Sequence, residues 1–149
     1  MVASDLSREL TAFEEGRLDP GRFRHRDHVR VSYELLERYP FPEALLRLAA
    51  GLRNLATKSG RPEVYHETIT AAFLALIGER RLGDCYSGWK DFAARNPDLL
   101  RKELLEDWYE PVVLQSSVAR QTFILPGKVT RAPSHLINTN VIPRAAKDL

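Results

Sequence analysis

The feature that most constrains the fold is an eleven-residue stretch without charge, Thr68 to Gly78, in a chain whose residues are 28% charged. Its centre, Ile69 to Ile77, is apolar on nearly every face, so a helix formed there must be surrounded by other elements. The stretch is too short for a bilayer, which requires about 20 apolar residues. It therefore predicts the central helix of a globular domain.

The rest of the chain predicts one helix after another, because apolar residues recur at helical spacing between turn signals. The expected helices span residues 4–16, 25–39, 42–58, 61–80, 87–95 and 96–109, with one or two further turns within 116–123. From residue 127 the periodicity disappears, and proline and β-branched residues favour an extended segment. We expect an all-α bundle of five or six helices in residues 1–126, followed by an extended C-terminal arm in residues 127–149.

Composition narrows the class of function. At 149 residues and 44% hydrophobic, the chain fits a single globular domain. The net charge of +2, without a basic run, argues against a nucleic-acid partner. The single cysteine, Cys85, excludes an internal disulfide, and the N-terminus lacks the pattern of a signal peptide. We therefore expect a soluble cytoplasmic protein with no membrane partner, in which the arm could complete a homodimer.

Three of the four histidines fall in two short motifs near the starts of predicted helices, HRDH at residues 25–28 and YHET at residues 65–68. His25 and His28 are three residues apart, so they share one helix face, which is apolar. His66 aligns in the same way with the apolar positions of the central helix. If the two helices pack side by side, the three histidines predict a single inward-facing site.

The first hypothesis for this site is a divalent metal, either zinc or iron. His25, His28 and His66 would be the ligands, and Glu67 would transfer a proton from a bound water or substrate. Asp27 would orient a histidine or assist the proton transfer. Both carboxylates have structural alternatives, because Asp27 can cap its helix and Glu67 can pair with an arginine.

A small-molecule substrate would bind beside the histidines, with Arg24 and Arg30 holding a carboxylate or phosphate. Tyr65 and Thr70 are candidate hydrogen-bonding partners for the same substrate. A hydrolase or lyase is the reaction class that such a metal site favours. Two alternatives remain open: a cofactor-free enzyme that uses a histidine–carboxylate pair, and a ligand-binding or dimerising module with structural histidines.

Four short runs of the sequence are distinctive enough to indicate one family: FRHRDHV at residues 23–29, RYPF at 38–41, YHETIT at 65–70 and FILP at 123–126. Together they resemble a family of small bacterial helical proteins. The resemblance covers most of the chain up to Pro126, leaves the arm outside, and implies no particular reaction. Metalloproteins of the DinB kind also hold a metal with three inward histidines, but their histidine spacing differs, which leaves only an analogy of fold.

Overall fold

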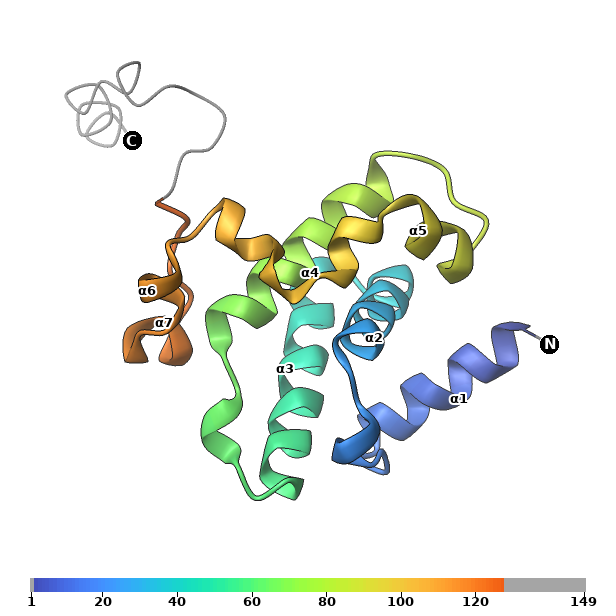
Figure 1. The fold of residues 1–149 in the computed structure, drawn as a ribbon. Helices are drawn as coiled ribbons and strands as arrows, with labels where there is room; N and C mark the ends of the chain where they lie inside the picture. The colour runs from blue at the N-terminus through green and yellow to red at the C-terminus, as the bar shows by residue number, and fades with distance from the viewer. Residues whose placement is uncertain (1, 128–149) are drawn as a thin grey trace, which may run out of the picture.

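A computed structural model describes residues 2–127, with side chains described from Arg8 onward. Within this range the chain forms helices joined by turns and contains no strand, which confirms the predicted all-α class (Figure 1). None of these helices combines the length and the apolar character needed to cross a membrane. The predicted arm, apart from Gly127, lies outside the described residues, and so the homodimer stays a prediction.

The helices follow one another with short connections. In chain order they are α1 (Val2–Glu14), α2 (His25–Arg38), α3 (Phe41–Lys58), α4 (Glu67–Leu82), α5 (Trp89–Arg95), α6 (Pro111–Leu114) and α7 (Ser117–Gln121). Between them lie four short 3₁₀ turns, η1 (Pro20–Arg22), η2 (Pro62–Val64), η3 (Pro97–Leu100) and η4 (Lys102–Asp107). Each of these turns except η4 begins at a proline, whose fixed φ suits the first position of a helical turn.

The helix boundaries around the site follow from local sequence. Tyr39 precedes Pro40 and adopts an extended backbone, with φ −131° and ψ 150°, so α2 ends there and α3 starts in a new direction. Helix α1 ends before Gly16, whose φ of +71° is costly for a residue with a side chain. Gly51 on α3 lets α1 approach closely, because a Cβ there would lie 2.2 Å from Phe13 Cζ.

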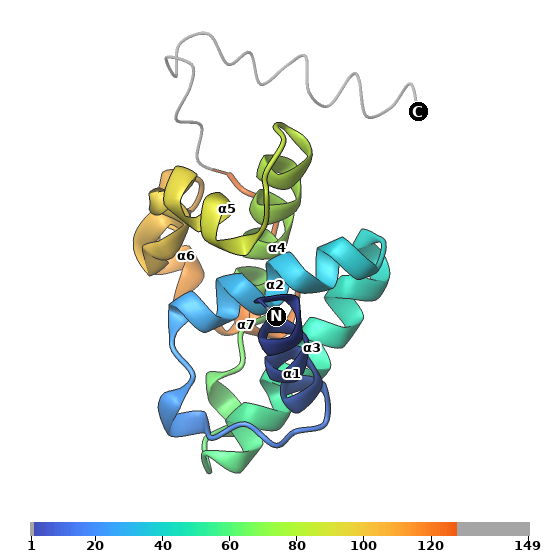
Figure 2. The ribbon, with the colours of Figure 1, turned by 90° about the vertical axis from the view of Figure 1, so that its right-hand side faces the viewer.

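Helices α2, α3 and α4 pack against one another and form the centre of the bundle (Figures 1 and 2). Phe73, Leu74 and Ile77 of α4 are almost completely buried, which confirms that the uncharged stretch forms a central helix. Helix α1 packs on α2 and α3, whereas α7 packs on α4. The start of α4 is thus enclosed between α3 and the C-terminal helices.

Two predicted helices differ from the structure. Residues 61–66 do not belong to α4, because His66 is extended, with φ −134°, and its side chain caps the helix. Residues 96–109 form two 3₁₀ turns in place of one α-helix. The expected cap, Asn96, makes no capping hydrogen bond; its amide instead donates to the carbonyl of Phe92 at 2.9 Å.

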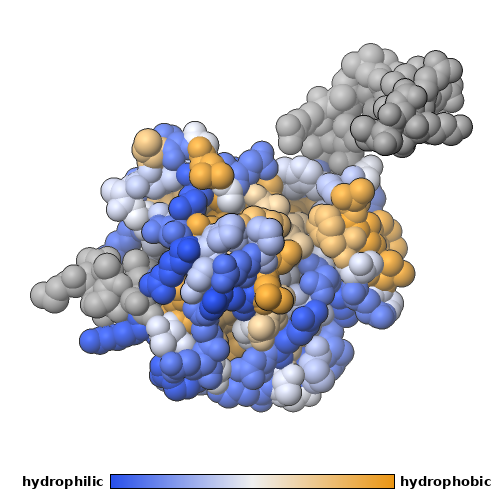
Figure 3. All heavy atoms as spheres, turned by 180° about the vertical axis from the view of Figure 1, so that it is seen from behind, coloured by the Kyte–Doolittle hydropathy of each residue, from blue (hydrophilic) through white to orange (hydrophobic). Residues whose placement is uncertain are grey.

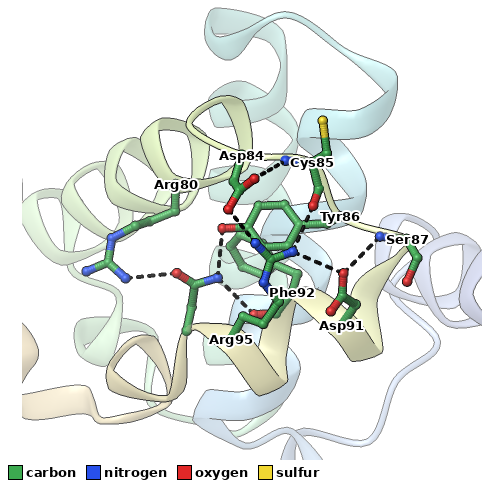
Figure 4. Close-up of polar contacts among 9 residues, drawn as sticks. Arg80, Asp84, Cys85, Tyr86, Ser87, Asp91, Phe92 and Arg95 are labelled. Atoms are coloured by element: carbon green, nitrogen blue, oxygen red, sulfur yellow. Dashed lines mark hydrogen bonds and ion pairs between the residues drawn. The ribbon is translucent and has the colours of Figure 1, made fainter.

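A polar cluster joins the loop after α4 to α5, and its central group is the guanidinium of Arg95 (Figure 4). This group donates to the Cys85 carbonyl at 2.7 Å, pairs with Asp84 and Asp91, and stacks over the ring of Tyr86. Each of these partners comes from residues 84–91, so the loop is held against α5 by charge and by ring contact. Cys85 is exposed, and the cluster engages only its backbone.

Asn96 connects this cluster to a second ion pair. Its Nδ2 donates to the Tyr86 hydroxyl at 3.2 Å, and its Oδ1 accepts a hydrogen bond from Arg80 at 3.0 Å. Arg80 also forms a bidentate pair with Asp98, at 3.0 and 2.6 Å, and the pKa of Asp98 is lowered by that pair. We call Arg80, Asp84, Tyr86, Asp91, Arg95, Asn96 and Asp98 the arginine cluster.

Candidate functional site

A cavity of about 360 Å³ opens where α2 and α4 begin and α3 ends. Its walls are mainly apolar and include Phe23, Leu52, Leu55, Val64 and Ile69. Six of the nine residues that the sequence predicted for the site also line it: Arg24, His25, His28, Tyr65, His66 and Thr70. The three histidines therefore meet at one cavity, although each has different hydrogen bonds.

His66 has both ring nitrogens engaged by the backbone. Nδ1 accepts from the Ile69 N–H at 3.1 Å, so Nε2 carries the proton and donates to the Leu114 carbonyl at 2.6 Å. Burial lowers the pKa of His66, which keeps the ring neutral, as the capping bond requires. His66 therefore starts α4 and ties it to α6, and no lone pair remains for a metal or a substrate.

His25 has one nitrogen engaged and one available. Its Nε2 lies 2.9 Å from the Leu99 carbonyl, so in the neutral ring the proton is on Nε2 and Nδ1 carries a lone pair. The ring meets Phe73 edge-on, with centroids 4.8 Å apart, and only partial burial leaves it accessible. Burial is the main cause that lowers the pKa of His25, and Lys102 lowers it further.

His28 lies deeper, next to His25, with ring centroids 5.9 Å apart. Its Nε2 is buried and has no hydrogen-bond partner among the described residues. Burial, together with the neighbouring His25, lowers the pKa of His28 to about 4, so the ring is neutral at physiological pH. An unpartnered buried nitrogen costs about 1–3 kcal/mol, which a bound molecule could recover by hydrogen bonding.

The geometry does not support the predicted metal site. Among the described residues, no group of three His, Cys, Asp or Glu side chains is placed to hold a metal ion. The set of His25, His28 and His66 is incomplete because both nitrogens of His66 are taken by the backbone. The described residues therefore offer no complete ligand set for the expected zinc or iron.

The two predicted catalytic carboxylates have structural partners and do not line the cavity. Asp27 accepts the Arg24 backbone N–H at 2.8 Å and thereby caps the start of α2. Glu67 binds Arg53 at 2.8 Å and accepts the Tyr65 hydroxyl at 3.1 Å. For both residues the structural alternative describes the contacts better than acid–base chemistry does.

Of the two predicted substrate-binding arginines, only Arg24 reaches the cavity. Arg30 forms a half-buried ion pair with Glu9 at 2.7 Å, which holds α2 to α1. Arg24 is exposed at the opening and makes no ion pair with another described residue. The structure thus separates two arginines that the sequence grouped together.

The hydroxyl groups of the lining are already used within the protein. Thr70 donates to the His66 carbonyl at 2.7 Å, and Ser59 donates to the Ala56 carbonyl at 2.7 Å. Tyr65 donates to Glu67, and Arg53 stacks on its ring at 4.6 Å from the centroid. Burial raises the pKa of Tyr65, so this hydroxyl keeps its proton. Tyr65 and Thr70 therefore act mainly as walls.

Sequence reasoning missed one feature of the site and one buried carboxyl group of α2 outside the cavity lining. The end of α3 forms a complete wall, although its sequence shows only an ordinary amphipathic helix. Glu34 of α2 is 6% exposed, its Oε2 has no partner among the described residues, and burial raises its pKa to about 7. The spacing of Arg30, Glu34 and Arg38 would be typical of a solvated helix face, so no sequence signal indicated this burial.

Apolar side chains also gather on the surface, on the side that carries α6 and α7 (Figure 3). The exposed members of this patch are Val112, Val118, Phe123 and Leu125, and Leu125 is the most exposed at 76%. The patch is separate from the cavity, but the His66–Leu114 hydrogen bond connects the two regions.

Six of the predicted residues therefore meet at one cavity, and two histidines there keep a nitrogen without a protein partner. The resemblance to small bacterial helical proteins stays a prediction and names no reaction. The chemistry of the site is therefore inferred from its geometry. Comparison of the chain with protein-family models, curated proteins and solved structures gives no match.

Proposed function

We propose that the protein binds a small organic molecule in the histidine cavity and transfers a proton to or from it without a metal or cofactor. The observation that carries this proposal is the state of His25, whose Nε2 is held by the Leu99 carbonyl while its Nδ1 keeps a lone pair beside the cavity. A fixed tautomer with a free lone pair is what a general base needs.

The lowered pKa of His25 suits this role at neutral pH. At neutral pH the His25 ring is deprotonated and can accept a proton. After this transfer, the hydrogen bond to the Leu99 carbonyl favours the protonated ring. His28 lies beside it as a second neutral ring with an unpartnered nitrogen. We assign His25 as the base and His28 as a hydrogen-bonding partner of the bound molecule.

The cavity also suits a small ligand. A volume of about 360 Å³ is at the lower end of the range for small-molecule sites, about 300–1,000 Å³. Its apolar walls would cover the side of the bound molecule that faces the protein, which strengthens the hydrogen bonds formed on that side. The ligand we expect is therefore compact and mainly apolar.

The proposal can be tested with 5-nitrobenzisoxazole, a small aromatic substrate that reports on any general base in an apolar site. Removal of its C3 proton breaks the N–O bond and releases a coloured cyanophenolate, and the proton passes to the base. We expect His25→Gln to lower kcat/KM by about 100-fold, which is typical for loss of a general base. His135→Gln changes the remaining histidine and serves as the matched control.

The pH profile and a chelator complete the test. The rate should rise with pH through an apparent pKa below 6.5 and then stay level, because the base acts in its neutral form. Dialysis against EDTA should leave the rate unchanged. An equal loss in both variants, or a rate that requires added zinc or iron, would contradict the proposal.

A second candidate function is binding without turnover, and the properties of His28 favour it. A ring with a pKa of about 4 is a weak base, although it can still hydrogen-bond a ligand. This candidate predicts that 5-nitrobenzisoxazole binds without release of product, and that His28→Leu weakens binding more than His25→Gln does.

A further inference from the structure

Among the residues that the structure describes, the lining of the cavity contains one permanently charged side chain, the guanidinium of Arg24, and no acidic residue. Arg24 stands at the opening with its guanidinium exposed, and it makes no ion pair with another described residue. The three arginines nearest to it in sequence all have partners: Arg22 with Asp19, Arg26 with the ring of Trp89, and Arg30 with Glu9. Arg24 is therefore the charged group of this lining that is available to a ligand.

Few other donors in the lining are free. The hydroxyls of Ser59, Tyr65 and Thr70 each donate to a protein oxygen, and Nε2 of His66 donates to a carbonyl. An anion that entered the cavity would therefore find Arg24 as its main partner. The neutral histidines would meet the rest of the molecule, and the apolar side chains of α3 and α4 would enclose it.

We infer that the ligand is a small carboxylic acid with an apolar body, whose carboxylate is bound by Arg24 and whose body fills the cavity. This inference rests on the proposed function and names its substrate class. One planar guanidinium offers two parallel N–H groups, which match a single carboxylate. A phosphate monoester is largely dianionic at neutral pH and would need donors that this lining has already used.

The test compares 4-phenylbutyrate with 4-phenylbutanamide, a neutral analogue of nearly the same shape, by isothermal titration calorimetry on the full chain. The wild type should bind the acid about tenfold more tightly than the amide, a preference that a bidentate charged contact can provide. Arg24→Gln should reduce this preference to about twofold or less, and Arg24→Lys should keep part of it. Arg22→Gln is the matched control, because Arg22 does not line the cavity.

Each outcome decides a specific point. Equal binding of acid and amide by the wild type overturns the inference but leaves the proposed function standing. Tighter binding of phenyl phosphate than of 4-phenylbutyrate overturns the assignment of a carboxylate. If neither probe binds while 5-nitrobenzisoxazole is converted, the inference alone is wrong. If neither probe binds and no conversion occurs, the proposed function is wrong as well.

Discussion

Around Arg95 and Asn96, each charged or amide group meets a protein partner, whereas in the cavity His25 and His28 each keep a ring nitrogen without one. Both regions are built from polar side chains near helix ends: the cavity lies where α2 and α4 begin, and the arginine cluster joins the end of α4 to α5. The arginine cluster makes its hydrogen bonds within the protein, so its contribution is to hold α4, α5 and the loop between them together. The cavity leaves part of its hydrogen-bonding capacity open.

This difference separates stabilising polar groups from groups available for binding. Hydrogen bonds to the buried amide of Asn96 stabilise the fold, while an unsatisfied buried nitrogen lowers stability and gains a partner only when a ligand enters. Substitutions should therefore have opposite consequences in the two regions. In the arginine cluster they should lower stability, and in the cavity they should affect ligand binding with little loss of stability or with a gain.

The largest loss of stability is expected for Asn96→Leu. Asn96 is 5% exposed and hydrogen-bonds Phe92, Tyr86 and Arg80, and each of these groups would lose a partner. We expect the free energy of unfolding to fall by about 3 kcal/mol, since unsatisfied buried groups cost about 1–3 kcal/mol each. Urea unfolding followed by circular dichroism measures this value.

The matched control for this substitution is Asn54→Leu, because Asn54 is exposed on α3. Surface substitutions of this kind stay within about 0.5 kcal/mol. Equal effects at the two positions would mean that the arginine cluster does not stabilise the protein. The contrast drawn between the cluster and the cavity would then be wrong.

The second prediction concerns His28→Leu and has the opposite sign. The pKa of His28 is about 4 in the folded protein and 6.5 without burial, so the unfolded chain binds its proton first as pH falls. Wild-type stability that depends on neutral His28 is complete above pH 6.5 and is lost as pH falls towards 4. At pH 5 this loss amounts to about 2 kcal/mol, which the leucine variant should not show.

The measurement is the difference in unfolding free energy between His28→Leu and the wild type at pH 5 and pH 8. Using a difference removes the contributions of other titrating groups, provided they are shared by both proteins. A constant difference across this range would indicate that His28 is solvated in the folded state. Its ring nitrogen would then already be hydrogen-bonded to water and would gain nothing from a bound ligand.

The fold was largely predictable because its signals are local. The uncharged stretch of α4 and the proline at residue 40 are enough to predict a central helix and the break between α2 and α3. The sequence also predicted that His25, His28 and His66 share one site, and all three line one cavity, although His66 is an extended N-cap and not part of the helix from which its position was inferred. The two 3₁₀ turns after Asn96 were not predictable, since the tertiary hydrogen bonds of this side chain replace its expected cap.

The chemistry of the histidines could not be predicted, because His25 and His66 hydrogen-bond distant backbone carbonyls whereas His28 has no such partner among the described residues. Leu99 lies 74 residues from His25, and Leu114 lies 48 residues from His66. A carbonyl has no side-chain signature, so the sequence cannot distinguish a capped histidine from an available one. The same limit applied to Asp27 and Glu67, whose identities suit catalysis as well as they suit capping and ion pairing.

The third prediction tests whether His66 belongs with the satisfied groups although it lines the cavity. His66→Ala removes the acceptor of the Ile69 N–H and the donor to Leu114, and we expect a loss of about 1.5 kcal/mol. His66→Asn should recover about half of this, since asparagine is a good N-cap. Equal stability of all three proteins in urea unfolding would show that the cap contributes nothing.

The last prediction concerns Glu34→Gln and extends the comparison to the other buried group of α2 without a full set of partners. Burial raises the pKa of Glu34 from 4.5 to about 7, while Arg30 and Arg38 limit the shift. Between pH 4.5 and 7 the folded protein holds a proton that the unfolded chain has released, so wild-type stability falls as pH rises through this window. The glutamine variant does not titrate and should therefore gain up to about 3 kcal/mol on the wild type between pH 4.5 and pH 8, which is the free energy that a pKa shift from 4.5 to about 7 corresponds to. Its advantage grows with rising pH, whereas the advantage of His28→Leu grows with falling pH.

Two buried groups on one helix that shift stability in opposite directions would be hard to explain if either were solvated. If the two variants respond to pH with the same sign, the assignment of both groups as buried and unpartnered is wrong.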